Sequence, residues 1–132
     1  MPSVLSQRRR LPAWPTAVVG DTLAVLVFAA IGRAGHDEST DAAGVWHTAW
    51  PFLLGAALGL AASAVARTSP TSVRAGVRVW VWTLVIGMVV RAATGVGIAI
   101  AFVIVAAVVL AALLIGWRAV LGRLSRWSRL LP

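Results

Sequence analysis

The stretch TAWPFLLGAALGLAASAVA, residues 48–66, carries no charged side chain over its 19 residues. At about 1.5 Å of rise per residue, a helix of this length crosses roughly 30 Å, which is the thickness of the hydrocarbon core of a bilayer. Residues 48–66 therefore predict a transmembrane helix. The segments on either side repeat the same pattern of an apolar run between short polar connections.

The other predicted spans cover residues 13–32, 77–92 and 96–117. The span at 77–92 is the shortest, because it has to fit between Arg78 and Arg91, whose guanidinium groups then reach toward the lipid headgroups. Thr94 to Gly97 are typical of a tight turn before the last span. The predicted fold class is all-α, an integral membrane four-helix bundle.

The overall composition supports a membrane protein. Of the residues, 60% are hydrophobic and 12% are charged, and the mean hydropathy is +0.90. A soluble domain has about 25% charged residues, because polar side chains must cover its core. Lipid is therefore the expected solvent along most of the chain, and the lipid bilayer is its first expected partner.

The arginines predict how the bundle is oriented. All 12 basic residues are arginine, and this usage, with many alanines, suggests a bacterial gene. In the alternating segments ten arginines fall on the side of the two termini, and only Arg33 and Arg91 fall on the other side. The positive-inside rule then places residues 1–12 and the C-terminus in the cytoplasm, with the spans in the plasma membrane. The same imbalance argues against an antiparallel dimer inserted both ways.

The C-terminal segment, residues 118–132, has a helical pattern of its own. Its arginines alternate with apolar residues, which are Leu121, Leu124, Trp127 and Leu130. This spacing predicts a short amphipathic helix on the cytoplasmic membrane surface. At the other end, small residues near Ala30 or Ala34 would also suit a cleavable signal peptide, but Asp21 and the length of the apolar run argue against cleavage.

Asp21 is the only acidic residue within a predicted span. An ionised carboxylate in the hydrocarbon region is costly, so intramembrane acids often belong to an ion, proton or substrate path. Ser63, Arg78 and Thr83 are expected at a similar depth, and the four residues predict one polar layer. Two interpretations stay open, a coupling site and a structural role in which Asp21 is protonated or pairs with Arg78.

A second group of polar residues is expected at the opposite face of the membrane. Its members are Arg33, His36, Trp50, Arg91 and Thr94. Two arginines at the ends of two spans predict a site for an anion or a lipid headgroup, although interfacial snorkelling would account for them equally well. The histidines and acids of the first loop match no standard metal-ligand spacing, so no metal and no cofactor are expected.

Gly55 and Gly59 form a GxxxG pattern within the second span. Small residues allow helix backbones to approach closely in lipid, where there is little hydrophobic drive for association. The pattern predicts a helix contact within the bundle in preference to a dimer interface.

The chain also resembles a known family. The residues that carry the resemblance are Gly20-Asp21, Phe28 to Glu38, Thr48 to Gly55, Arg91 to Gly95, and Ala101 to Val103. They resemble a family of small four-helix membrane proteins of actinobacteria and some archaea, known as domain of unknown function 3054. The resemblance implies the four-helix architecture and implies no activity.

Function is less constrained than fold. The chain has no cysteine, no phosphate-binding loop, no HExxH motif and no nucleophile elbow, so an enzyme is not expected. Its arginines flank apolar runs, which does not indicate nucleic-acid binding. The leading hypothesis is a non-enzymatic structural or accessory membrane component with a partner membrane protein or a second copy of itself. The alternatives are a small ion or solute transporter or channel, acting as a parallel oligomer with Asp21 as coupling residue, and a quinone- or lipid-binding protein with Trp50, Arg33 and Arg91 at the headgroup.

Overall fold

The computed structural model describes residues 12–35 and 38–131. Within these ranges it contains no strand and four helices, α1 (Ala13–Gly35), α2 (Ala42–Val65), α3 (Val73–Ala93) and α4 (Ile100–Leu130). All four are long and apolar enough to cross a membrane. The predicted all-α, four-helix architecture is therefore confirmed. The predicted N-terminal segment up to Leu11, with its three arginines, lies outside the described residues.

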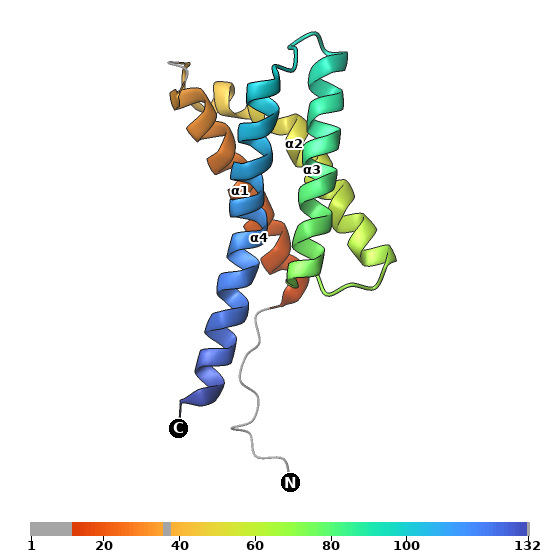
Figure 1. Cartoon of the computed structure of the whole chain (residues 1–132), viewed down its shortest axis with the longest axis vertical. Helices are drawn as coiled ribbons and strands as arrows, with labels where there is room; N and C mark the ends of the chain where they lie inside the picture. The colour runs from red at the N-terminus through yellow and green to blue at the C-terminus, as the bar shows by residue number, and fades with distance from the viewer. Residues whose placement is uncertain (1–11, 36–37, 132) are drawn as a thin grey trace.

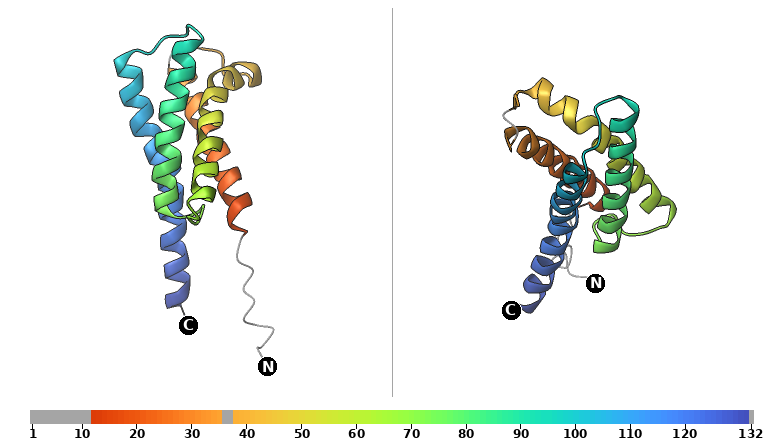
Figure 2. Two further views of the ribbon diagram at one scale, coloured as in Figure 1. Left: turned by 90° about the vertical axis from the view of Figure 1, so that its right-hand side faces the viewer. Right: turned by 45° about the horizontal axis from the view of Figure 1, so that its top comes forward.

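The helices pack in a ring, in which α1 and α3 each contact both α2 and α4. Figure 1 shows the α2–α3 loop at one end of the bundle, together with the start of α1, and the α3–α4 turn at the opposite end. We call these the Pro70 end and the Gly95 end, after a residue in each connection. Helix α4 extends well beyond the other helices at the Pro70 end (Figures 1 and 2).

Large apolar side chains cover the outside of the bundle. Exposed examples come from α1, α2, α3 and α4, and include Leu23, Leu54, Val85, Ile104 and Val108. In water such a surface would be unfavourable, because each exposed apolar side chain forgoes its transfer free energy. In a bilayer the same surface faces hydrocarbon, so the outward faces suit a membrane-spanning bundle.

Two helices begin earlier than the sequence pattern predicted. Helix α2 starts at Ala42, because the carboxylate of Asp41 accepts a hydrogen bond of 2.8 Å from the backbone N–H of Gly44. That hydrogen bond, with one from Ser39 and the charge of Arg33, lowers the pKa of Asp41 below its usual 3.8. Helix α3 starts at Val73, because the hydroxyl of Ser72 caps it in the same way. The third span is therefore 21 residues long, not the short segment expected between two arginines.

The chain turns into α4 through glycines and then stays helical to Leu130. Gly95 and Gly97 have φ angles of +76° and +86°, which side chains with a Cβ rarely adopt. The expected tight turn is therefore present. The tail is helical, but residues 118–130 continue α4 without a break and do not form the separate helix expected for them. The reason is local: no proline occurs between Ile100 and Leu131, and the i to i+4 pattern continues past Arg118.

Helix α2 is bent. The two views of Figure 2 show its first turns running across the bundle at the Gly95 end, while the remainder runs along it. Pro51 lies inside this helix and is buried. A proline in a helix interior removes one backbone hydrogen bond and its ring pushes the preceding turn aside, which accounts for the bend. The bend brings the first turns of α2 over the ends of α1 and α3.

The contact between α2 and α3 is the closest in the bundle. A Cβ atom built on Gly55 would lie 2.7 Å from the Cα atom of Thr83, and one on Gly59 would lie 2.7 Å from the Cα atom of Val79. Both glycines of the GxxxG pattern thus face α3 of the same chain. Where Gly55 and Gly59 face α3, the two helix backbones pack directly against each other, without interdigitating side chains.

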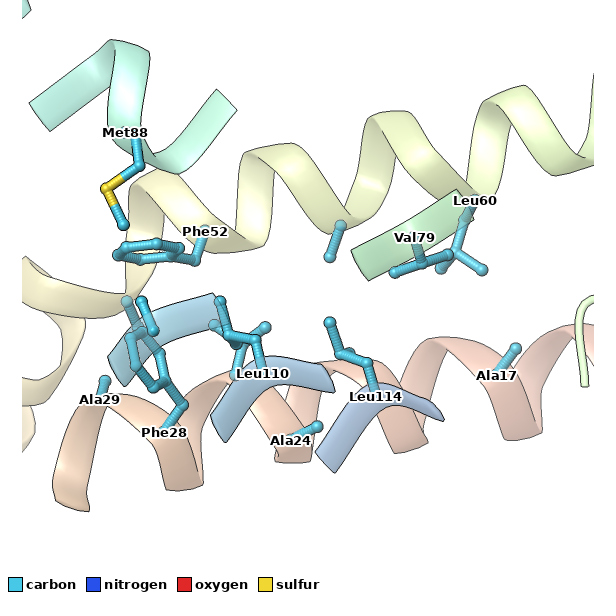
Figure 3. Close-up of a cluster of buried hydrophobic side chains, with 14 residues drawn as sticks. Ala17, Ala24, Phe28, Ala29, Phe52, Leu60, Val79, Met88, Leu110 and Leu114 are labelled. Atoms are coloured by element: carbon cyan, nitrogen blue, oxygen red, sulfur yellow. The ribbon is translucent and has the colours of Figure 1, made fainter. Parts of the chain in front are cut away.

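Aromatic side chains fill the core nearer the Gly95 end. Phe28 of α1 and Phe52 of α2 point toward each other in Figure 3, with ring centroids 5.0 Å apart in an edge-to-face arrangement. Met88 lies on the other side of Phe52 (Figure 3). Gly87 makes room for this ring, because a Cβ there would clash with Cδ1 of Phe52. Leu110 and Leu114 of α4 continue the core toward the Pro70 end.

The α2–α3 contact gives a direct test of the packing. Gly55→Ala should destabilise the protein by about 1–3 kcal/mol, because the new methyl group cannot fit against the α3 backbone. Gly116→Ala is the matched control, since no atom lies within 4 Å of a Cβ built there and alanine favours a helix. Thermal unfolding in detergent should show a lower unfolding temperature for Gly55→Ala and no decrease for Gly116→Ala. Equal stability of the two variants would contradict the close contact.

Candidate functional site

Asp21 and Arg118 form a buried ion pair. Arg118 Nη1 donates to Asp21 Oδ1 at 2.7 Å, and Arg118 Nη2 donates to Asp21 Oδ2 at 2.8 Å. Each residue is only 1% exposed. Two parallel charge-assisted hydrogen bonds fix the guanidinium plane against the carboxylate. The pair joins α1 directly to α4.

The remaining donors of this ion pair are also used. Arg118 Nε donates to the carbonyl of Pro70 at 3.0 Å, and Nη1 also donates to the carbonyl of Leu114 at 2.9 Å. Trp117 Nε1 donates to Asp21 Oδ1 at 3.0 Å. The ion pair therefore connects α1, α4 and the α2–α3 loop through hydrogen bonds. Burial of two charges is tolerated only when their polar atoms are satisfied in this way.

Two glycines make room for Arg118 and for the neighbouring Trp117. A Cβ built on Gly20 would lie 2.9 Å from Cε2 of Trp117. A Cβ built on Gly76 would lie 2.7 Å from Cδ of Arg118. The Trp117 ring also lies beside the cation, with its centroid 4.4 Å from Cζ of Arg118. Gly20 of α1 and Gly76 of α3 thus leave the space that Trp117 and Arg118 of α4 occupy.

The expected polar layer is not assembled as predicted. Arg78 does not pair with Asp21; its Nη1 donates to Thr68 Oγ1 at 2.8 Å and to Ser63 Oγ at 3.4 Å. Thr83 is fully buried against α2, and its hydroxyl is one of two buried side-chain polar atoms that lack a partner in the described part of the chain. The four residues therefore belong to three separate settings.

Sequence reasoning missed Arg118 and assigned it to the cytoplasmic tail. One signal pointed to it. Asp21 needs a cation, and Arg118 is the first charged residue after the uncharged stretch 92–117, at the same end of the bundle as Asp21. The sequence alone does not distinguish Arg118 from Arg78 as the partner of Asp21, because both arginines lie near the same end of the bundle.

At the Gly95 end, Arg33 is held by several partners. Its Nη1 donates to Thr48 Oγ1 at 3.0 Å and lies 3.2 Å from Glu38 Oε2, and its Nε donates to the carbonyl of Ser39. These contacts connect the end of α1 to the first turns of α2. The guanidinium of Arg33 is consequently fixed in position.

Arg91 reaches the same region from the end of α3. Its Cζ lies 4.3 Å from the centroid of the Phe102 ring in α4. Its Nε is buried and has no hydrogen-bond partner within the described ranges. Arg33 of α1 and Arg91 of α3 thus approach the same region. Arg33 has several partners there, whereas the buried Nε of Arg91 has none within the described ranges.

Two adjoining cavities at the Gly95 end bring the predicted residues of this face together. Their volumes are about 500 and 390 Å³, and both are lined by Arg33, Glu38, Thr48, Arg91 and Val96. We call them together the Gly95 groove. Trp50 and Thr94 line the smaller cavity, while the predicted His36 lies outside the described residues. No cluster of three metal-ligating side chains occurs within residues 12–35 and 38–131.

Two further hollows lie on the sides of the bundle. One of about 620 Å³ lies between α1 and α4 beside Trp117, and its lining residues are almost all apolar. The other, of about 460 Å³, lies between α1 and α2 and is bordered by Asp21, Thr22 and Trp14. We call the second hollow the α1–α2 groove.

Four apolar helices closed by an intramembrane ion pair are the features of a multi-pass α-helical membrane protein. Residues 18–121 match the model of a family described as Protein of unknown function (DUF3054), and the chain belongs to this family. The family resemblance expected from the sequence is thus confirmed. Searches of curated proteins and of solved structures found no match.

A double-mutant cycle tests the ion pair. Asp21→Leu or Arg118→Met alone should destabilise the protein by about 3–5 kcal/mol, because each leaves one buried charge without its partner. The double variant should recover most of that loss, because no charge remains unpaired. Thermal unfolding in detergent and abundance in membranes measure both effects.

Arg78→Met is the matched control for this cycle. It removes an arginine from the same end of the bundle and leaves the Asp21–Arg118 pair intact, so its cost should be about 1 kcal/mol from lost hydroxyl contacts. In the Asp21→Leu, Arg78→Met double variant, the losses of unfolding free energy from the two single substitutions should add. Additivity in the Asp21–Arg118 cycle, or recovery in the Asp21–Arg78 combination, would show that the pairing is wrong.

Proposed function

We propose that this chain is a non-enzymatic structural or accessory component of the plasma membrane, with both termini in the cytoplasm. In this proposal the intramembrane polar residues hold the helices together and do not move ions. The observation that carries it is the state of Asp21. An acid that couples ion movement has to exchange protons or ions with water, whereas Asp21 is 1% exposed and bound by three donors from Arg118 and Trp117.

The distribution of arginines supports the orientation. At the Pro70 end lie Arg67, Arg74, Arg78 and the four arginines of α4. At the Gly95 end lie Arg33 and Arg91. Positive charge near span ends is retained on the cytoplasmic side during insertion, so the Pro70 end is the cytoplasmic one in this proposal.

The chemistry of the chain supports the absence of catalysis. The chain contains only four acidic residues, two histidines and no cysteine. The carboxylate of Asp21, which is the most deeply buried within the described ranges, is already paired with the charge of Arg118. Hydrolysis and group transfer need an activated nucleophile or a poised acid–base pair, and the ion pair offers neither.

A second candidate function is a small ion or solute transporter acting as a parallel oligomer. One observation favours it: Asp21 borders the α1–α2 groove, which has a volume of about 460 Å³. A neighbouring copy packed over this groove would enclose a space beside the carboxylate. The structural proposal and this candidate differ in whether the charge of Asp21 is needed for activity or only for stability.

Single cysteines test the orientation, because the chain has none of its own. Thr40→Cys lies in the exposed connection before α2, and Ser128→Cys lies in the exposed last turns of α4. In intact cells a membrane-impermeant maleimide should label the first variant only, and permeabilised cells should show labelling of both. The reverse pattern would place the termini outside, and labelling of both in intact cells would contradict a single orientation.

Flux through reconstituted liposomes tests the function. Wild-type protein should give no proton or ion flux above that of empty liposomes, measured with an internal pH dye and with ion-selective electrodes. The Asp21→Leu, Arg118→Met double variant provides the comparison, because it lacks the acid but is expected to fold. If the wild type carries flux and the double variant, at equal reconstituted amount, does not, the transporter function replaces the structural one.

A further inference from the structure

The Gly95 groove has two unlike walls. Phe102 and Ile98 form an apolar wall in the larger cavity, to which Phe28 adds little because it is only 4% exposed. Arg33, Arg91 and Glu38 form a charged wall that both cavities share. Binding sites for small molecules commonly combine an apolar lining with a few well-placed polar groups, and volumes of about 300–1,000 Å³ are typical of them. The groove therefore has the form of a site for a ligand with one apolar and one polar part.

Arg91 supplies a donor that the protein itself does not use. Its Nε is buried without a hydrogen-bond partner, although a buried donor in that state is unfavourable. Stacking on Phe102, with Cζ 4.3 Å from the ring centroid, holds the guanidinium plane in place. The Nε atom itself has no exposed surface, so a ligand in the groove would have to use the other N–H groups of this guanidinium.

The charge of the groove favours an anion. Two arginines face one acid, Glu38, which is paired with Arg33 at 3.2 Å. The side chain of Glu38 is 56% exposed, so it screens the arginines only in part. Ala99, which precedes the first turn of α4 and provides no side-chain cap, also lines the groove. The free N–H groups and positive dipole of that turn add to the attraction for negative charge.

We propose that the Gly95 groove binds one anionic amphiphile, a lipid whose phosphate lies between Arg91 and Arg33 and whose apolar part lies along Ile98 and Phe102. A free oxyanion would use the charged wall and leave the aromatic wall unoccupied. A lipid without net charge, such as phosphatidylcholine, offers a phosphate but also carries its own cation, so it would gain less from the two arginines. An anionic phospholipid uses both walls, and a groove at the end of a bundle of membrane-spanning helices lies where its headgroup is found. This inference goes beyond the proposed structural function and does not depend on it.

Calorimetric titration of the full chain in detergent tests the proposal with three probes. Dihexanoyl phosphatidylglycerol carries both the anion and the apolar chains, dihexanoyl phosphatidylcholine has the same chains without net charge, and inorganic phosphate has no chains. The phosphatidylglycerol should bind with one site per chain and roughly tenfold or more tighter than either other probe. Equal binding of phosphate would reassign the groove to a free oxyanion. Equal binding of phosphatidylcholine would show that the charge is not recognised.

Variants of α3 show where the lipid binds. Arg91→Ala should lower the affinity for phosphatidylglycerol to that for phosphatidylcholine. Arg74→Ala is the matched control, because Arg74 is an exposed arginine of the same helix at the opposite end. Arg74→Ala should leave the affinity for phosphatidylglycerol unchanged. An equal loss of affinity in both variants would indicate nonspecific electrostatic attraction and overturn the proposal.

Arg91→Lys covers the case in which Arg91→Ala does not fold. Lysine keeps the charge but lacks the planar fork of N–H groups, so the affinity should fall severalfold. Wild-type affinity in Arg91→Lys would overturn the role assigned to the guanidinium of Arg91.

Discussion

A carboxylate and a guanidinium that leave water for the interior of a helix bundle each lose several kcal/mol of solvation, and they recover it only if they meet in good geometry. Asp21 and Arg118 meet this condition through two parallel hydrogen bonds of 2.7 and 2.8 Å. The requirement extends outward, because the pair forms only when α1 lies against α4 and the carbonyl of Pro70 is within reach of Arg118 Nε. The closed ring of helices and the position of the α2–α3 loop both depend on it.

The other contacts of the bundle have a different physical origin. Helices α2 and α3 approach closely because Gly55 and Gly59 have no side chains, so dispersion contacts between backbones hold them. At the Gly95 end the aromatic side chains Phe28 and Phe52 fill the core. Hydrogen bonds of Arg33 also join α1 to α2 at this end, but the Arg33 and Arg91 side chains there line a groove, whereas Arg118 is buried.

Much of this architecture was predictable from the sequence, and the failures have specific causes. The spans followed from apolar length, and the turn at Gly95 followed from its glycines. Helix starts were missed because the capping roles of Asp41 and Ser72 act outside the apolar runs that defined the spans. The partner of Asp21 was missed because depth along a helix is readable from sequence, whereas the face on which a side chain lies depends on how four helices close into a ring. The residues of the Gly95 groove were anticipated as a group, but the presence of Phe102 in the same cavity was not, because it depends on how α1, α3 and α4 pack against one another.

The long α4 helix has a mechanical consequence. Arg118 lies within it and is bound on one side to α1 and on another to the α2–α3 loop, while the following turns to Leu130 project beyond the bundle. A helix is stiff over a dozen residues, at about 1.5 Å of rise each. A force on the projecting turns would therefore tilt α4 about Arg118, where the helix is bonded to the rest of the bundle. Torque applied to these turns would reach α1 directly, through the three hydrogen bonds that Trp117 and Arg118 donate to Asp21.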